Sequence, residues 1–159
     1  TGPSGPPDAQ IFRQPSSMAI TSQNFTYGFL GYHHYSASGG SLDAGSLGGG
    51  WRIRRWLGLE GGAQYVRGSG TDVINGYAEA LFLLPMGSRA SIFASVGGAY
   101  THASASVAGF SVTSNASGYR AGFGLEYWLA PRWGARFTVH RQNAGGVIDN
   151  YSLSLAYRL

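Results

Sequence analysis

The sequence of 159 residues contains no cysteine and no lysine, and only 11% of its residues carry a charged side chain. The absence of cysteine excludes disulfides and cysteine-based metal sites. Soluble domains have about 25% charged residues, with both signs interspersed over the surface. This chain is therefore too poor in charge for an ordinary soluble surface.

Long apolar runs are missing as well. The mean hydropathy is −0.08, and no stretch approaches the roughly 20 apolar residues that a membrane-spanning helix requires. Glycine, in contrast, is abundant at 26 residues, and aromatic residues make up 14% of the chain. Low charge with average hydropathy favours a membrane β-barrel, in which apolar and polar residues alternate along each strand.

The positive charge does not indicate a nucleic-acid partner. The formal net charge is +4, but the arginines are scattered, and the one cluster is the pair Arg54 and Arg55. No recognition helix or RNA-binding signature accompanies them, so nucleic-acid binding is not expected.

The chain divides into two regions. Residues 1–22 contain four of the six prolines and show no periodicity, which predicts an extended or disordered tail. Residues 23–159 predict a single all-β domain of eight antiparallel strands, each about the 9–11 residues of a tilted membrane strand or longer. The expected strands are 24–35, 41–53, 58–67, 73–84, 91–103, 117–129, 134–143 and 147–159.

The last expected strand shows the clearest alternation. Its apolar face contains Tyr151, Leu153, Leu155, Tyr157 and Leu159, while serine, alanine and arginine occupy the other face. A period of two with one apolar face is the signal of a half-buried strand.

The connections between the expected strands differ at the two ends. Residues 54–57, 85–90 and 130–133 predict tight turns, whereas the other connections are polar and more variable in length. This alternation is typical of an up-and-down barrel in an outer membrane. Within 104–116 the pattern predicts a hairpin tip, with the fifth and sixth strands extending past the lipid.

Aromatic side chains gather near the ends of the expected strands. Aromatic rings with a polar group favour the membrane–water interface, so two girdles are expected. The alternative is that these rings fill the core of a soluble β-sandwich. The girdle at the tight turns comprises Trp51, Trp56, Trp128 and Trp133, and the opposite girdle comprises Tyr35, Tyr65, Tyr77, Tyr100, Tyr119 and Tyr151.

Over residues 24–159 the chain resembles the small eight-stranded outer-membrane β-barrels, the OmpA-like and OmpX-like porin family. The resemblance rests on the segments 28–32 (GFLGY) and 55–60 (RWLGLE) and on the alternating final strand. It implies a bacterial outer-membrane location, with the final strand as the signal read by the barrel-assembly machinery. That family usually ends in phenylalanine, whereas Leu159 stands here.

If the apolar faces point to lipid, the polar side chains line the lumen. A charge on the lipid face would cost about 2–4 kcal/mol at the bilayer midplane. Because eight strands leave room only for side chains, pairs of arginine and carboxylate are expected to plug the interior. An ion path through this network is the alternative. The expected lumen network is Arg52, Glu60, Gln64, Glu79, Arg120, Glu126, Arg136, His140 and Arg158.

Enzymatic and metal-dependent functions are not indicated. The segment from His140 to Gln142 is similar to the His-x-Ser stretch of lipid A deacylases, but glutamine cannot attack an ester. No serine is paired with a histidine at a recognisable spacing. The adjacent His33 and His34 point to opposite faces of a strand, so they cannot chelate a metal together. We expect no catalytic residue, cofactor or metal.

The sequence thus predicts an integral outer-membrane barrel with a structural or scaffold role and with both termini in the periplasm. Expected partners are outer-membrane lipid, the barrel-assembly machinery and, through the proline-rich tail, other envelope proteins. The alternatives are a small ion-conducting porin and a lipocalin-like barrel that binds a small apolar ligand.

Overall fold

The computed structural model describes residues 24–37, 40–68, 71–107, 109–144 and 147–159. The predicted tail over residues 1–22 lies outside these ranges. The described residues form eight strands. Their bounds are β1 (Phe25–Ala37), β2 (Gly40–Arg54), β3 (Leu57–Gly68), β4 (Thr71–Met86), β5 (Ala90–Val107), β6 (Phe110–Trp128), β7 (Trp133–Asn143) and β8 (Val147–Arg158).

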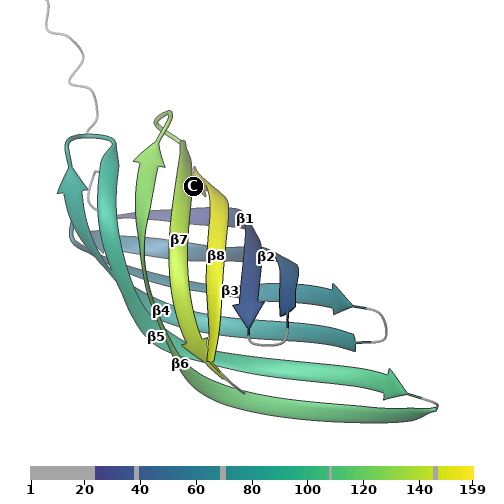
Figure 1. The fold of residues 1–159 in the computed structure, drawn as a ribbon. Coiled ribbons are helices and arrows are strands. Elements are labelled where there is room, and N and C mark those ends of the chain that lie inside the picture. Colours follow the sequence, from purple (N-terminus) through teal and green to yellow (C-terminus); the bar gives the residue numbers. More distant parts are fainter. Residues whose placement is uncertain (1–23, 38–39, 69–70, 108, 145–146) are drawn as a thin grey trace, which may run out of the picture.

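The strands form a closed antiparallel barrel in chain order, in which β1 also pairs with β8 (Figure 1). The closing register runs from Tyr27 opposite Arg158 to Ser36 opposite Asp149. No helix among the described residues is long and apolar enough to span a membrane. The predicted eight-stranded up-and-down barrel is confirmed.

The longest strands, β5 and β6, form a hairpin that projects beyond the rest of the barrel (Figure 1). The sequence predicts that β6 begins at 117, but it begins at Phe110, because residues 110–117 continue to pair with β5. The turn contains Gly109 with φ of 83°, a backbone conformation that suits glycine. The expected extension of this hairpin is confirmed, and its paired part is longer than predicted.

The barrel has two ends, to which we give fixed names. The tight-turn end contains the connections 55–56, 87–89 and 129–132, and the long-hairpin end contains 38–39, 69–70, 108–109 and 144–146. The expected contrast between tight turns and longer variable loops is wrong. Residues that look like loop in the sequence extend the strands instead, so the connections are short at both ends.

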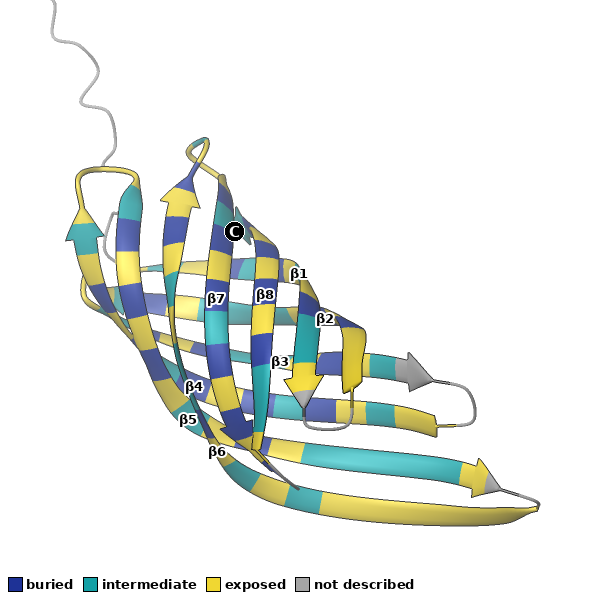
Figure 2. Ribbon diagram, in the orientation of Figure 1, coloured by how far each residue is buried: buried dark blue, intermediate teal, exposed yellow. Residues whose placement is uncertain are grey.

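Buried and exposed residues alternate along the strands within the barrel, whereas the projecting part of β5 and β6 has no buried residue (Figure 2). On β7, Phe137 is exposed while its neighbours Arg136 and Thr138 are buried. On β8, Leu153 is exposed between the buried Ser152 and Ser154. An apolar exterior around a polar interior is the arrangement expected of a barrel in lipid.

Several glycines make room for aromatic rings inside the barrel. Gly50 pairs across the sheet with Tyr27, and a Cβ atom on Gly50 would collide with the tyrosine ring. An aromatic ring lying over a cross-strand glycine is a known way to support a glycine in a sheet. The other pairs of this kind are Phe29 with Gly48, Tyr77 with Gly62, Phe93 with Gly124, and Trp128 with Gly134. The high glycine content therefore has a packing role here.

Candidate functional site

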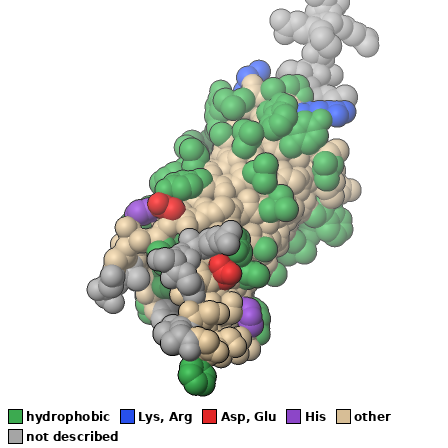
Figure 3. Space-filling model, turned by 90° about the vertical axis from the view of Figure 1, so that its right-hand side faces the viewer, with side chains coloured by type: hydrophobic (Ala, Val, Ile, Leu, Met, Phe, Trp, Pro, Cys, Tyr) green, Lys and Arg blue, Asp and Glu red, His purple; other side chains and the backbone are tan. Residues whose placement is uncertain are grey.

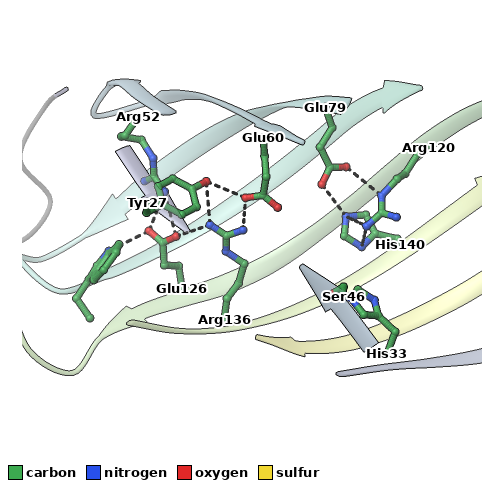
Figure 4. A network of polar contacts seen from close by, with 11 residues as sticks. Tyr27, His33, Ser46, Arg52, Glu60, Glu79, Arg120, Glu126, Arg136 and His140 are labelled. Carbon is green, nitrogen blue, oxygen red and sulfur yellow. Dashed lines mark hydrogen bonds and ion pairs between the residues drawn. The ribbon is translucent and has the colours of Figure 1, made fainter. Parts of the chain in front are cut away.

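The lumen contains three groups of polar side chains, arranged from the tight-turn end towards the long-hairpin end. The first, called the ionic cluster, is drawn on the left of Figure 4. Its members come from five different strands and are all buried. They are Tyr27, Arg52, Glu60, Glu126, Trp128 and Arg136.

Glu126 is the centre of the ionic cluster. Both of its oxygens accept hydrogen bonds at 3.0 Å from Nη2 of Arg52, and Oε2 accepts a further bond at 2.8 Å from Arg136. The indole Nε1 of Trp128 donates to Oε1 at 3.1 Å. One carboxylate thus serves two guanidinium groups, which is how buried charges are tolerated in a protein interior.

Arg136 extends the cluster across the barrel. Its Nη1 forms an ion pair with Glu60 on β3, while its Nη2 bonds Glu126 on β6 and the Tyr27 hydroxyl on β1. The Tyr27 hydroxyl in turn donates to Glu60 at 2.7 Å. In the closed strand order β3 and β6 are not neighbours, so this chain of bonds crosses the lumen.

The second group, the central cluster, consists of Glu79, Arg120 and His140. Glu79 accepts from Nε of Arg120 at 3.3 Å and lies 3.2 Å from Nε2 of His140. The guanidinium of Arg120 also lies over the ring of Tyr77, 3.9 Å from its centroid. A buried arginine is held here by one carboxylate and one aromatic face.

The third group, the amide cluster, contains no charged carboxylate or guanidinium group. Nδ2 of Asn75 donates to Gln64 at 2.8 Å and to Gln142 at 3.0 Å, and Thr101 donates to Asn75 at 3.2 Å. The hydroxyl of Tyr35 donates to the same oxygen of Gln64. These neutral groups satisfy one another towards the long-hairpin end of the lumen.

His33 lies beside this amide cluster and is in contact with a serine. Its Nε2 is 2.6 Å from Oγ of Ser46, and its Nδ1 is 3.1 Å from Oδ1 of Asn150. A serine in contact with a histidine that is held by an asparagine resembles a nucleophile with its base and an orienting group. The spacing of these residues in the sequence does not reveal the contact. All three side chains are buried, and none of them lines the cavity described next. We therefore interpret the contact as packing.

A cavity of about 180 Å³ opens at the long-hairpin end, above the amide cluster. Its walls are apolar and include Leu42, Val66, Val73 and Ile148. Its polar lining residues are Asn75, Gln142, Thr101 and Tyr35, which belong to the amide cluster. This mouth cavity combines apolar walls with a few converging polar groups, which is typical of sites for small molecules.

Comparison with protein families decides the classification. Residues 11–158 match the model of the outer membrane protein beta-barrel domain, which is most of the chain. The chain belongs to this outer-membrane β-barrel family. The predicted family is thereby confirmed, and the protein is an outer-membrane barrel of the bacterial envelope.

Solved structures of small outer-membrane barrels are similar to this family member in fold. The N-terminal barrel of OprF from Pseudomonas aeruginosa has a TM-score of 0.67 at 13% identity, covering 86% of this chain and 100% of that one. Ail from Yersinia pestis gives 0.65 at 14%, covering 87% and 100%. Neisserial surface protein A gives 0.65 at 16%, covering 87% and 97%. Among curated proteins, no sequence matches this chain.

Of the nine side chains expected in the lumen of this outer-membrane barrel, eight are buried there. The ninth, Arg158, is partly buried at the tight-turn end, where its guanidinium lies 3.8 Å from the ring centroid of Phe25 and 4.8 Å from that of Trp128. The eight are Arg52, Glu60, Gln64, Glu79, Arg120, Glu126, Arg136 and His140.

The structure corrects three members of the expected aromatic girdles. Trp128 is 1% exposed and points into the lumen, because it has the same strand parity as Glu126. Tyr77 is buried beside Arg120, and Tyr35 points inward to Gln64. The remaining girdle residues are exposed on the outside, namely Trp51, Trp56, Trp133, Tyr65, Tyr100, Tyr119 and Tyr151.

The side chains proposed as an assembly signal lie on β8 and just after it. Tyr151, Leu153, Leu155 and Leu159 are exposed, and the ring of Tyr157 packs edge-on against Trp133 at 4.8 Å. They form an apolar strip on the exterior.

Metal coordination has no geometric support among the described residues, where no group of three or more His, Asp or Glu side chains could hold an ion. His34 and His102 are each hydrogen-bonded near the long-hairpin end, to Asp43 at 2.8 Å and to Asn115 at 2.5 Å.

Sequence reasoning missed the inward residues of β1 and two amides of the third group, Asn75 and Gln142. Tyr27, Phe29 and His33 face the lumen. Tyr27 and Phe29 have large aromatic rings, which the sequence pattern alone would place on the lipid-facing side. The available signal was the run of glycines 48–50 in the neighbouring strand, which leaves space for rings across the sheet. Reading it requires the register between β1 and β2.

Proposed function

We propose that the protein is a structural outer-membrane barrel whose lumen is closed to ions by its own side chains. One observation carries the proposal: the bonds from Glu60 through Arg136 to Glu126 and Arg52 connect opposite walls of the barrel. A barrel of eight strands has an interior just wide enough to be filled by side chains. The charges of the ionic cluster are also balanced, with two carboxylates against two guanidinium groups.

Planar-bilayer recording tests the closed lumen. Folded protein, identified by its heat-modifiable mobility on gels, is inserted at known density, and the current is recorded under an applied voltage. The proposal expects a baseline without conductance steps. Reproducible steps at a frequency proportional to the inserted protein would overturn it and support the ion-conducting alternative.

The orientation and biogenesis of the barrel follow from the same proposal. With eight strands, the beginning of β1 and the end of β8 lie at the tight-turn end. We assign this end to the periplasm because the long β5–β6 hairpin projects from the opposite end, and outer-membrane barrels extend further on their extracellular side. The exterior strip on β8 then faces the assembly machinery during insertion.

The tail over residues 1–22 is proposed as a docking arm for another envelope protein. The support is its composition, since proline-rich extended segments lose little entropy when they bind. Deleting residues 1–20 tests the idea by affinity purification from the envelope. A co-purifying protein that is lost with the deletion supports docking, and an unchanged set of proteins overturns it.

A second candidate function is the binding of a small apolar molecule, favoured by the mouth cavity. A volume of about 180 Å³ is comparable to engineered apolar cavities of about 150 Å³ that bind benzene. Titration with single-ring aromatic compounds, followed by NMR of the wall methyl groups, tests it. Saturable shifts that disappear in Val73→Trp support the site, and unsaturable shifts shared by both proteins contradict it.

A further inference from the structure

Exposed arginines are concentrated in the three turns of the tight-turn end. Arg54 is the last residue of β2 and Arg55 follows it in the turn to β3. Arg89 stands between β4 and β5, and Arg132 stands between β6 and β7. All four side chains are exposed. Each turn thus places at least one guanidinium group on the same rim of the barrel, which we call the arginine rim.

No aspartate or glutamate side chain among the described residues shares this rim. Three of the described carboxylates are the lumen glutamates, and the other three lie near the long-hairpin end. Each of those three has a polar partner: Asp43 accepts from Tyr32, Asp72 accepts from Tyr65, and Asp149 accepts from Arg141. In Figure 3 the arginines lie at the upper end of the visible face, and the carboxylates and histidines lie lower down.

The exposed tryptophans mark the depth of the rim in the membrane. Trp51, Trp56 and Trp133 are all exposed at the tight-turn end, and exposed tryptophans prefer the headgroup region. Two of the rim arginines directly precede them in sequence, as Arg55–Trp56 and Arg132–Trp133. The rim arginines therefore stand at the level where lipid phosphates lie.

Contacts at the turns hold parts of the rim in place. The backbone carbonyl of Arg89 accepts from the amide of Trp128 at 2.8 Å, which connects the second turn to the end of β6. The backbone carbonyl of Arg132 accepts from the backbone amide of Arg158 at 2.8 Å. Nη1 of Arg132 donates to the Tyr157 hydroxyl at 3.2 Å. Arg132 is thus kept beside an interfacial tyrosine.

We propose that the arginine rim binds the headgroup phosphates of anionic phospholipids in the leaflet that faces the tight turns. Guanidinium groups bind phosphate oxygens through two parallel hydrogen bonds. The rim presents exposed guanidinium groups at each of the three turns, with no aspartate or glutamate side chain of the described residues beside them, so it is complementary to anionic headgroups. This binding is independent of whether the lumen conducts.

Tryptophan fluorescence gives a direct measurement, because all exposed tryptophans lie at the rim. The folded protein is reconstituted in mixtures of phosphatidylcholine and phosphatidylglycerol, with bromine placed near the glycerol of one lipid or the other. Quenching then gives the relative association constant of the anionic lipid at the rim. The proposal expects a clear preference for phosphatidylglycerol, with a contribution of about fivefold per arginine at low salt that falls as salt is added.

Two variants and one control locate the effect. Replacing the four rim arginines by glutamine (R54Q/R55Q/R89Q/R132Q) should bring the relative constant close to one, and lysine at the same positions should keep part of the preference. Arg141→Gln, at the long-hairpin end, should leave it unchanged. If the fourfold variant does not regain heat-modifiable mobility, the double variant R54Q/R55Q provides the same comparison with a smaller decrease.

Other outcomes overturn the proposal. A relative constant near one in the unmodified protein, or a preference that persists in the glutamine variant, excludes the rim as the lipid site. Binding of the barrel to insoluble peptidoglycan that requires the rim arginines, without any lipid preference, would assign the rim to that polymer instead.

Discussion

The two halves of the lumen, which meet at the central cluster of Glu79, Arg120 and His140, are filled by different chemistry. Near the tight turns, Arg52, Glu60, Glu126 and Arg136 cross the barrel as ion pairs, with aromatic rings packed between them. Near the long hairpin, neutral amides bond one another and an apolar cavity lies above them. The same strand scaffold thus fills one half of the lumen with ion pairs and leaves a cavity in the other.

Removing one side chain should cost more free energy of unfolding in the ionic half than in the amide half. Buried ion pairs are stable when complete, but removing one partner leaves an uncompensated charge in a dry interior. A neutral amide that loses its partner costs less, since only a polar group is left unsatisfied. The two halves are therefore expected to respond differently to matched substitutions.

The largest effect is expected for Glu126→Ala. The substitution removes the carboxylate that binds Arg52 and one nitrogen of Arg136, and it should lower the free energy of unfolding by about 3–5 kcal/mol. Urea titration in lipid vesicles, followed by gel mobility, measures the change. A loss below about 1 kcal/mol, on the scale of a surface pair, would show that the ionic half is not held by this carboxylate.

Gly50→Ala should give the next largest effect. The new methyl group collides with the ring of Tyr27 and displaces the hydroxyl that bonds Glu60. Overpacking of this kind costs about 1–3 kcal/mol. Gly45→Ala on the same strand is the control, because nothing lies within 4 Å of its added Cβ. Equal effects of both substitutions would contradict the pairing of glycine with an aromatic ring.

A smaller effect is expected for Asn75→Leu in the amide half. The substitution removes the hydrogen bonds to Gln64 and Gln142 without leaving a buried charge, and about 1–2 kcal/mol should be lost. The same urea titration measures it beside Glu126→Ala. A loss as large as that of Glu126→Ala would remove the distinction between the two halves.

The smallest effect is expected at the exterior of the long-hairpin end. Arg141 and Asp149 form an exposed ion pair at 2.8 Å, and exposed pairs contribute little to stability. Asp149→Asn should leave the unfolding midpoint within error. A clear shift of the midpoint would mean that the surface charge at this end stabilises the barrel after all.

The exterior of the barrel could be predicted from the sequence because its signal is local. On β8 the large side chains from Tyr151 to Tyr157 alternate with serine and alanine, so periodicity alone assigns the two faces. On β1 it does not, since Phe29 and Leu30 are both large and apolar but face opposite sides. Only the cross-strand register with Gly48 resolves which of them is inside.

The inward direction of the lumen charges could also be predicted from local sequence, but their ion-pair partners could not. An arginine near the middle of a membrane strand has to face inward. The sequence does not show, however, that Arg136 meets Glu60, 76 residues away. The errors at Tyr35 and Trp128 arose because strand-end aromatics were assigned by position along the strand. Strand parity, which pairs Trp128 with Glu126, would have placed it inside.

Single-channel recording of two matched variants shows whether the ionic half closes the lumen. If it does, the unmodified barrel and Asn75→Ala/Gln142→Ala, in the amide half, have no conductance. Glu60→Ala/Arg136→Ala, in the ionic half, should produce discrete steps while retaining heat-modifiable mobility. Steps in the unmodified protein, or in the amide variant but not in the ionic one, would mean that the ionic half does not close the lumen.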